Sequence, residues 1–175
     1  LGKIGIPVEI LEFPGKLSPQ AMRVMRTHVE LTEKILGQDV EEKIKRIALR
    51  HHEKMDGSGY PEGISGKDLT MGERIVAVAD IVSALAGTRS YKDAFPKERI
   101  LSIINKMKED GLIDKDVVDK VTMDFDEIME ITRNRCQPIL DMYHRIQSEY
   151  LQIEGYMAGI SQAGISEDIS EKGNG

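Results

Sequence analysis

The chain contains no tryptophan, only 5% aromatic residues and a single cysteine, Cys136. One cysteine excludes an internal disulfide, which fits the reducing cytoplasm. No apolar run approaches the roughly 20 residues that a membrane span needs. The net charge of −6 argues against a surface that coats nucleic acid, so a phosphate ligand would need a local cluster of basic groups. These absences indicate a globular cytoplasmic protein without nucleic-acid or membrane contacts.

The residues that are present favour helices. Leucine, isoleucine, valine, methionine and alanine recur at helical spacings, and 175 residues suffice for one well-buried domain but not for two. We therefore predict an all-α fold that begins with a connecting loop containing one helical turn. The predicted helices cover about residues 18–36, 39–52, 70–86 and 96–107, the last closing at Gly111, and Asp114 is expected to cap one more short helix.

A long loop interrupts this helical pattern. Four glycines and Pro61 between Glu53 and Leu69 are incompatible with a regular helix, and loops of this length often carry function. Thr70 and Glu73 then form a capping-box pair, which predicts that the next helix begins there.

Candidate metal ligands lie on three of the predicted helices. His28 lies on or beside the apolar stripe of the first, His51 and His52 end the second, and Asp80 lies inside an apolar run of the third. A buried carboxylate without a partner costs several kcal/mol, so Asp80 is expected to pair with a cation, to be protonated or to bind metal. Imidazole and carboxylate together suit Mn, Fe or Zn. From spacing alone, a packed or surface histidine is the commoner interpretation of His28, while packed histidines at 51 and 52 and a structural salt bridge at Asp80 remain open.

The segment HHEKMDGSGYP, residues 51–61, resembles the HHE..DG.GYP signature of the HD-GYP phosphodiesterases of the HD superfamily. The likeness covers about residues 1–120. It implies a helical bundle that binds two or three divalent ions, usually iron or manganese, with ligands at His28, His51, His52 and Asp80. It also implies hydrolysis of the bacterial second messenger cyclic di-GMP to pGpG or onward to GMP.

The same resemblance assigns roles outside the ligand set. Lys3 matches a lysine that follows the family's His-Asp dyad and would stabilise the phosphoryl charge as a catalytic residue. Arg89 and Lys92 match positions that bind the substrate's phosphates. The loop residues Gly59, Tyr60 and Pro61 would shape the rim of the substrate site.

The dyad itself does not occur in this chain, because Leu1 matches the spacer residue that follows it in the family. We expect the dyad, and a sensory or receiver domain, upstream of Leu1, and we expect residues 1–175 alone to hydrolyse little cyclic di-GMP. A non-catalytic module that binds a cyclic dinucleotide is the alternative of another class. Within enzymes, the alternative is an HD-superfamily phosphohydrolase that acts on another nucleotide.

A final helix is predicted from about Asp124 to Glu154, with a kink at Pro138. Two sets of its residues repeat every seven positions, namely Met129, Cys136, Tyr143 and Tyr150, and Phe125, Thr132, Ile139, Ile146 and Ile153. Such a stripe suits either a homodimer or packing back onto the bundle. The predicted organisation is thus a phosphodiesterase domain at 1–123, a helix at 124–154 and a flexible tail at 155–175.

Overall fold

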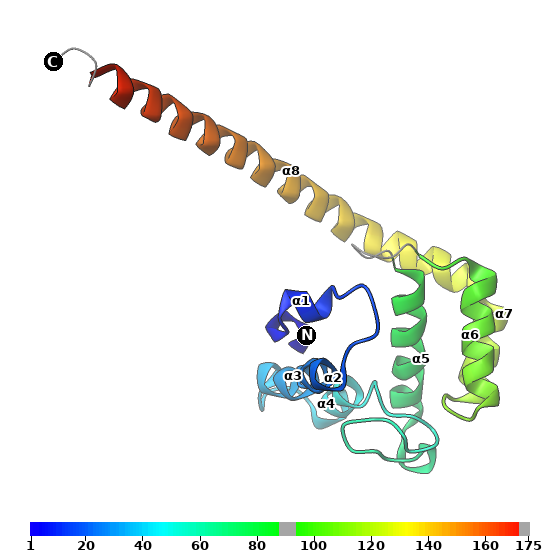
Figure 1. Cartoon of the computed structure of the whole chain (residues 1–175). Helices are drawn as coiled ribbons and strands as arrows, with labels where there is room; N and C mark the ends of the chain where they lie inside the picture. The colour runs from blue at the N-terminus through cyan, green and yellow to red at the C-terminus, as the bar shows by residue number, and fades with distance from the viewer. Residues whose placement is uncertain (88–93, 172–175) are drawn as a thin grey trace. The chain divides into compact units, whose positions relative to one another are not determined.

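The computed structural model describes the backbone of residues 1–87 and 94–171, and over these ranges it is helical without a strand (Figure 1). The predicted all-α class is therefore confirmed. The chain divides into two compact units, Leu1–Met123 and Asp124–Gly175. In chain order, the elements are η1 (Gly2–Gly5), α1 (Val8–Leu11), α2 (Pro19–Arg26), α3 (His28–Leu36), α4 (Glu42–Leu49), η2 (Gly66–Asp68), α5 (Met71–Ala86), α6 (Lys97–Glu109), α7 (Lys115–Met123) and α8 (Phe125–Glu171).

The helix predicted over 18–36 is in fact two helices, α2 and α3, separated at Thr27. Ser18 caps α2 as expected, because its Oγ accepts the Ala21 N–H at 3.2 Å. At Thr27 both the N–H and the side-chain hydroxyl donate to the Val24 carbonyl, at 3.1 and 2.7 Å. This tight turn redirects the chain. His28 consequently begins a new helix.

Helix α4 is shorter than the predicted 39–52. It ends at Leu49, and its last bond runs from the Arg50 N–H to the Arg46 carbonyl at 3.0 Å. His51 and His52 therefore lie in the turn after the helix and not on its apolar face, which corrects the predicted helical periodicity. The loop predicted from Glu53 to Leu69 is confirmed, with the single turn η2 inside it.

Helix α5 begins with the predicted capping box, in which Thr70 and Glu73 each bond the other's backbone N–H. It contacts α4, α6 and α7. The core between these helices contains Val78 from α5, Ile104 from α6 and Val118 from α7, each no more than 1% exposed. Gly87 follows the end of α5, as predicted.

The starts of α6 and α7 also agree with the sequence. Pro96 precedes α6, and the φ of +68° at Gly111 is the left-handed conformation that lets the chain leave a helix end. Asp114 caps α7, because its Oδ1 accepts the N–H groups of Asp116 and Val117 at 3.0 and 3.1 Å. These local signals set helix boundaries where packing does not override them.

Helix α8 continues to Glu171, past the predicted end at Glu154. Gly155 does not stop it, because a glycine inside a helix costs only about 1 kcal/mol. Pro138 also lies within the helix. Among the described helices of the chain, none combines the length and the apolar composition that crossing a bilayer requires.

Candidate metal centre

Three histidines converge in the first unit. His28 begins α3, while His51 and His52 occupy the turn after α4, and one ring nitrogen of each lies within 4.8 Å of the others. The Nε2 atom of His28 is 3.4 Å from the Nε2 of His51 and 3.2 Å from the Nε2 of His52. The packing of α3 against α4 therefore brings together histidines that are 23 residues apart in sequence.

The hydrogen bonds of two rings decide which nitrogen faces the cluster. Nδ1 of His28 lies 2.7 Å from the Met25 carbonyl, and Nδ1 of His51 lies 2.8 Å from the Ala48 carbonyl. A carbonyl only accepts, so Nδ1 carries the proton in both rings and each Nε2 presents a lone pair to the cluster. Lone pairs facing one another at these distances fit a bound cation, and backbone bonds of this kind orient metal ligands.

The electrostatics favour neutral rings. Burial lowers the pKa of His28 and of His51, and it lowers the pKa of His52 to about 3, with the neighbouring histidines and Lys3 adding to the shift. Neutral imidazole is the form that binds metal. The donor set therefore fits a divalent ion.

Asp80 is less buried than the sequence suggested. Its side chain is 32% exposed, and its Oδ2 lies 4.0 Å from Nδ1 of His52. The prediction of burial was wrong because the apolar residues around Asp80 do not all face the core: Ile75, on the same helix, is 47% exposed. Asp80 nevertheless lies beside the histidine cluster and raises the pKa of His51 electrostatically, after the larger effects of burial and the Ala48 bond.

Lys3 reaches the centre through η1, which packs on α3. The Gly2 N–H donates to Oγ1 of Thr32 at 2.9 Å, and that hydroxyl donates to the His28 carbonyl at 2.8 Å. A Cβ at position 2 would collide with that same carbonyl, so only glycine allows this approach. The charge of Lys3 contributes to lowering the pKa of all three histidines.

The loop forms one side of the centre through Tyr60. Its ring stacks on the His52 ring, with the centroids 4.6 Å apart, and its N–H donates to the His52 carbonyl at 3.2 Å. A Cβ on Gly59 would lie 2.5 Å from the Glu53 Cα, so the loop can pass this close only with glycine. The Tyr60–Pro61 peptide is cis. Burial raises the pKa of Tyr60 to about 12, so its hydroxyl stays protonated at neutral pH.

Residues 1–117 match the family model described as "HD domain". The chain belongs to the HD domain family. The match ends within α7, so it covers nearly all of the first unit and none of α8. The centre described above, from Lys3 to Asp80, thus lies wholly within the HD domain.

Several named proteins are similar to part of this chain. A 3'3'-cGAMP-specific phosphodiesterase of Vibrio cholerae is 45% identical over 57% of this chain and 20% of its own length. A cyclic di-GMP phosphodiesterase response regulator of Xanthomonas campestris is 42% identical over 59% of this chain and 28% of its own. A cyclic di-GMP phosphodiesterase of Thermotoga maritima is 38% identical over 61% and 30%. The match therefore spans less than a third of each of these relatives.

Two predicted substrate residues, Arg89 and Lys92, lie outside the described residues.

Two residues that contact the loop, Glu53 and Arg26, were not predicted to have a role. Glu53 is 3% exposed, and its Oε1 accepts the N–H groups of Glu62 and Gly63 at 2.7 and 3.0 Å, which closes the loop of the HD domain on itself. Its place in the signature was a signal that could have indicated this role.

The second missed residue is Arg26 of α2, whose guanidinium carbon lies 4.6 Å from the centroid of the Tyr60 ring. No motif singled it out. Its position depends on the break at Thr27 and on the path of the loop, and neither was predicted in enough detail to place it.

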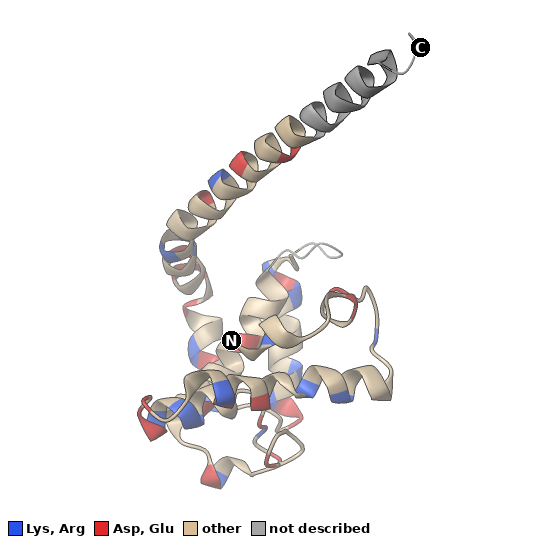
Figure 2. Ribbon diagram, turned by 90° about the vertical axis from the view of Figure 1, so that its left-hand side faces the viewer, with Lys and Arg blue, Asp and Glu red and all other residues tan. Residues whose placement is uncertain are grey.

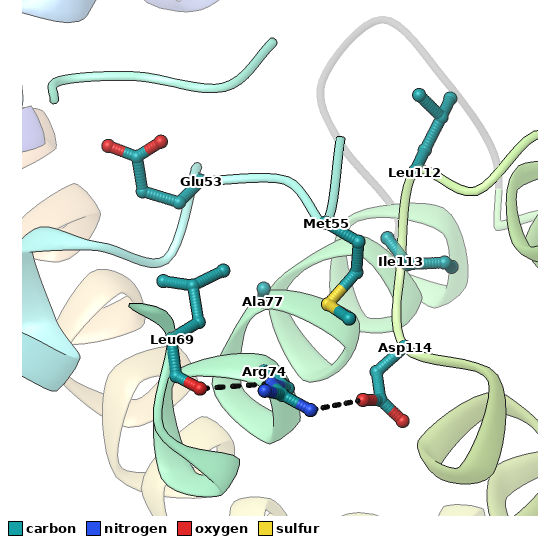
Figure 3. Close-up of a pocket in the computed structure, with 8 residues that line it drawn as sticks. All are labelled: Glu53, Met55, Leu69, Arg74, Ala77, Leu112, Ile113 and Asp114. Atoms are coloured by element: carbon teal, nitrogen blue, oxygen red, sulfur yellow. Dashed lines mark hydrogen bonds and ion pairs between the residues drawn. The ribbon is translucent and has the colours of Figure 1, made fainter. Parts of the chain in front are cut away.

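Glu53 also lines a cavity of about 10 Å³, room for roughly one water (Figure 3). Arg74 lines it and bonds the Leu69 carbonyl at 3.0 Å and the Asp114 carboxylate at 3.1 Å. These contacts tie the end of the loop to α5 and to the start of α7. The cavity is too small for a nucleotide, so its role in the HD domain is structural.

Proposed function

We propose that this HD domain hydrolyses a 3'-5' phosphodiester of cyclic di-GMP, giving pGpG or GMP. The observation that carries the proposal is the set of imidazole lone pairs at His28 and His51, which converge with His52 beside Asp80. Family membership and the names of the relatives support a cyclic dinucleotide as the substrate.

In this proposal His28, His51, His52 and Asp80 hold two or three divalent ions, iron or manganese. Bound ions of this kind supply a nucleophile from water and neutralise the charge of phosphoryl oxygens. Lys3 adds a positive charge where negative charge develops on the phosphoryl group. Tyr60, with Gly59 and Pro61, shapes the rim and excludes water from one side of the centre. Arg89 and Lys92 contribute further cations to the substrate's phosphates.

A second candidate substrate is 3'3'-cGAMP, which differs from cyclic di-GMP in one base. The observation in its favour is the Vibrio cholerae relative, which is 45% identical and is named for specificity toward 3'3'-cGAMP. The histidine centre would act on the phosphodiester of either compound. The choice between them therefore depends on contacts to the bases.

The test is hydrolysis of each cyclic dinucleotide by the protein in its natural length, loaded with Mn²⁺ or Fe²⁺. Products are separated by chromatography, and kcat/KM is compared for the two substrates. We expect cyclic di-GMP to be the better substrate. A higher kcat/KM for 3'3'-cGAMP would make it the preferred candidate substrate in place of cyclic di-GMP. Tight binding of either compound without turnover would favour the non-catalytic module.

We also propose that α8 pairs with its copy in a homodimer. One stripe of the helix repeats at the alternating spacing of three and four residues that suits a second helix of the same kind. Each of the six side chains in this seam is between 55% and 63% exposed: Ile139, Tyr143, Ile146, Tyr150, Ile153 and Met157. A sequence identical to its own would cover the stripe without a further protein.

Charges beside this seam favour antiparallel pairing. In a parallel pair, Glu149 would face Glu154 of the partner subunit, and like charges repel. In an antiparallel pair centred between Tyr143 and Ile146, Arg133 would instead face that glutamate. The exposed, free Cys136 would lie far from its copy in the antiparallel pair and beside it in the parallel one.

The setting proposed for the HD domain is the cytoplasm, where a free, exposed cysteine such as Cys136 stays reduced. A sensory or receiver domain would regulate it, as the response-regulator name of the Xanthomonas campestris relative suggests.

A further inference from the structure

Arg26 and Tyr60 form a platform at the rim of the histidine centre. The guanidinium carbon of Arg26 lies 4.6 Å from the Tyr60 ring centroid, and the Tyr60 ring stacks on His52 with a centroid separation of 4.6 Å. The distance from the guanidinium carbon to the centroid of the His52 ring is therefore no greater than the sum of these two distances. Its charge also contributes to lowering the pKa of His52, after burial and the charges of His51, His28 and Lys3.

The side chains that act on the histidines make the rim positive. Lys3 and Arg26 are the cationic side chains whose charges act on them, and Asp80 is the carboxylate. The chain as a whole carries a net charge of −6, and Figure 2 shows basic and acidic residues interspersed along its helices. A local excess of positive charge in such a chain attracts an anion to this place.

Arg26 is available for an anion. It is exposed, and among the described residues it takes part in no ion pair. A cation–π contact with an aromatic face does not use the N–H donors of the guanidinium, so the edge of the group stays available to a further partner. That edge matches two phosphate oxygens in a bidentate contact. Arg23, one turn earlier on α2, is exposed as well, but it does not stack on Tyr60.

We propose that Arg26, held on Tyr60, is a substrate-binding residue that contacts the phosphodiester not being cleaved while the other one occupies the histidine centre. A cyclic dinucleotide has two such anions, so a cation at the rim holds the ring in place through the second. This inference rests on the proposed function. It predicts that Arg26 lowers KM and contributes little to kcat, because its contact is the same in the substrate and in the transition state.

The test compares Arg26→Gln with Arg23→Gln in the metal-loaded protein of natural length, with cyclic di-GMP as substrate. We expect KM to rise about tenfold in Arg26→Gln, as for the loss of one charge-assisted hydrogen bond, with kcat unchanged within twofold. The dependence of KM on salt should weaken in the same variant, because one ionic contact is lost. Arg23→Gln should match the unaltered protein in all three quantities.

A purely structural role would leave a different signature. If Arg26 only held the loop, its removal would also weaken inhibition by guanosine, which has no phosphate, and would leave the salt dependence unchanged. Either result, or equal KM values for the two variants, would overturn the inference while turnover by the unaltered protein upheld the proposed function. Absence of turnover by the unaltered protein would overturn both.

Discussion

At the scale of single residues, His52 links the ligand cluster to the loop. Its Nε2 lies 3.2 Å from that of His28, its Nδ1 faces Asp80, and its ring and carbonyl both contact Tyr60. A ligand held on several sides loses little freedom when metal binds. His52 is therefore the position at which a substitution should weaken both metal binding and the order of the rim.

We expect His52→Ala to lower the affinity for Mn²⁺ at least tenfold, because one of the converging ring nitrogens is removed. The measurement is a titration of the metal-stripped chain, followed by elemental analysis after desalting. His144→Ala, which removes an exposed histidine on α8, is the matched control and should bind as the unaltered chain does. Equal affinity in both variants would refute the assignment of His52 as a ligand.

The histidine cluster also predicts how stability depends on pH. Burial holds the pKa of His52 near 3, while the unfolded side chain titrates near 6.5. Below pH 6.5 the unfolded chain binds a proton that the folded chain does not, so the free energy of unfolding falls as pH falls. The slope is about 1.4 kcal/mol per pH unit for one such histidine. Above pH 6.5 this contribution is constant.

The measurement is urea unfolding of the metal-free chain at pH 7.0 and pH 5.0. The unaltered chain should lose stability on acidification, and His52→Gln should lose less, because glutamine does not titrate. His144→Gln should behave as the unaltered chain. A pH-independent unfolding free energy in the unaltered chain would contradict the depressed pKa.

The signature predicted His51 and His52 as candidate metal ligands. The distances among the three histidines, however, depend on packing that local sequence patterns do not determine. The burial of Asp80 was misjudged because an apolar stretch of sequence was taken for a helix buried on all sides. Arg26 could not be predicted, because its contact with Tyr60 joins a helix end to a loop. The sequence motif therefore predicted which residues belong to the site, but it did not predict their contacts.

At the scale of elements, α5 is fixed by its first turn. Glu73 is 1% exposed, accepts the Thr70 N–H at 2.6 Å and pairs with Arg50 and Arg46 at 3.2 and 3.3 Å. Its carboxylate therefore joins the start of α5 to the end of α4, next to the turn that holds His51 and His52.

We expect Glu73→Ala to lower the free energy of unfolding by about 3 kcal/mol, because it leaves the half-buried Arg50 without one of its carboxylates and removes the Glu73 half of the capping box. The control is Asp110→Asn, which breaks the exposed pair with Lys106 and should leave the free energy of unfolding nearly unchanged. Urea unfolding measures both. A loss as small in Glu73→Ala as in the control would contradict this account of α5.

For α8, light scattering coupled to gel filtration should find a dimer in the unaltered chain. Ile146→Asp places a charge in the centre of the seam and should give a monomer. Ser148→Asp, on the opposite face of the helix, should leave the dimer intact. Mild oxidation should not join two chains through Cys136, since antiparallel pairing separates the two sulfurs. A monomeric unaltered chain would exclude the dimer and favour packing back onto the bundle.

Helix boundaries followed the sequence where side-chain caps set them, as at Ser18, Thr70 and Asp114. They departed from it where a backbone turn decided, as at Thr27, which no glycine or proline marks. Gly155 was predicted to end the final helix. One glycine inside a helix, however, lowers its stability too little to end a helix of this length. Caps and breakers are local signals, whereas a turn within a helical pattern depends on what packs on either side.

At the scale of the whole molecule, a chain of net charge −6 places two cationic side chains, Lys3 and Arg26, near its histidine cluster. The HD domain accounts for the first unit, and α8 forms the second. Under the two proposals, residues 1–117 carry out the chemistry and the long helix associates with its copy. The central claim is that the histidine centre holds the metal ions on which hydrolysis depends.

The most direct test is the rate of cyclic di-GMP hydrolysis by the protein in its natural length, before metal removal, after chelation and after return of Mn²⁺ or Fe²⁺, with His52→Ala treated in parallel. The account predicts turnover that chelation abolishes and metal restores, and no restored turnover in His52→Ala. Turnover that survives chelation, or that His52→Ala retains in full, would contradict it.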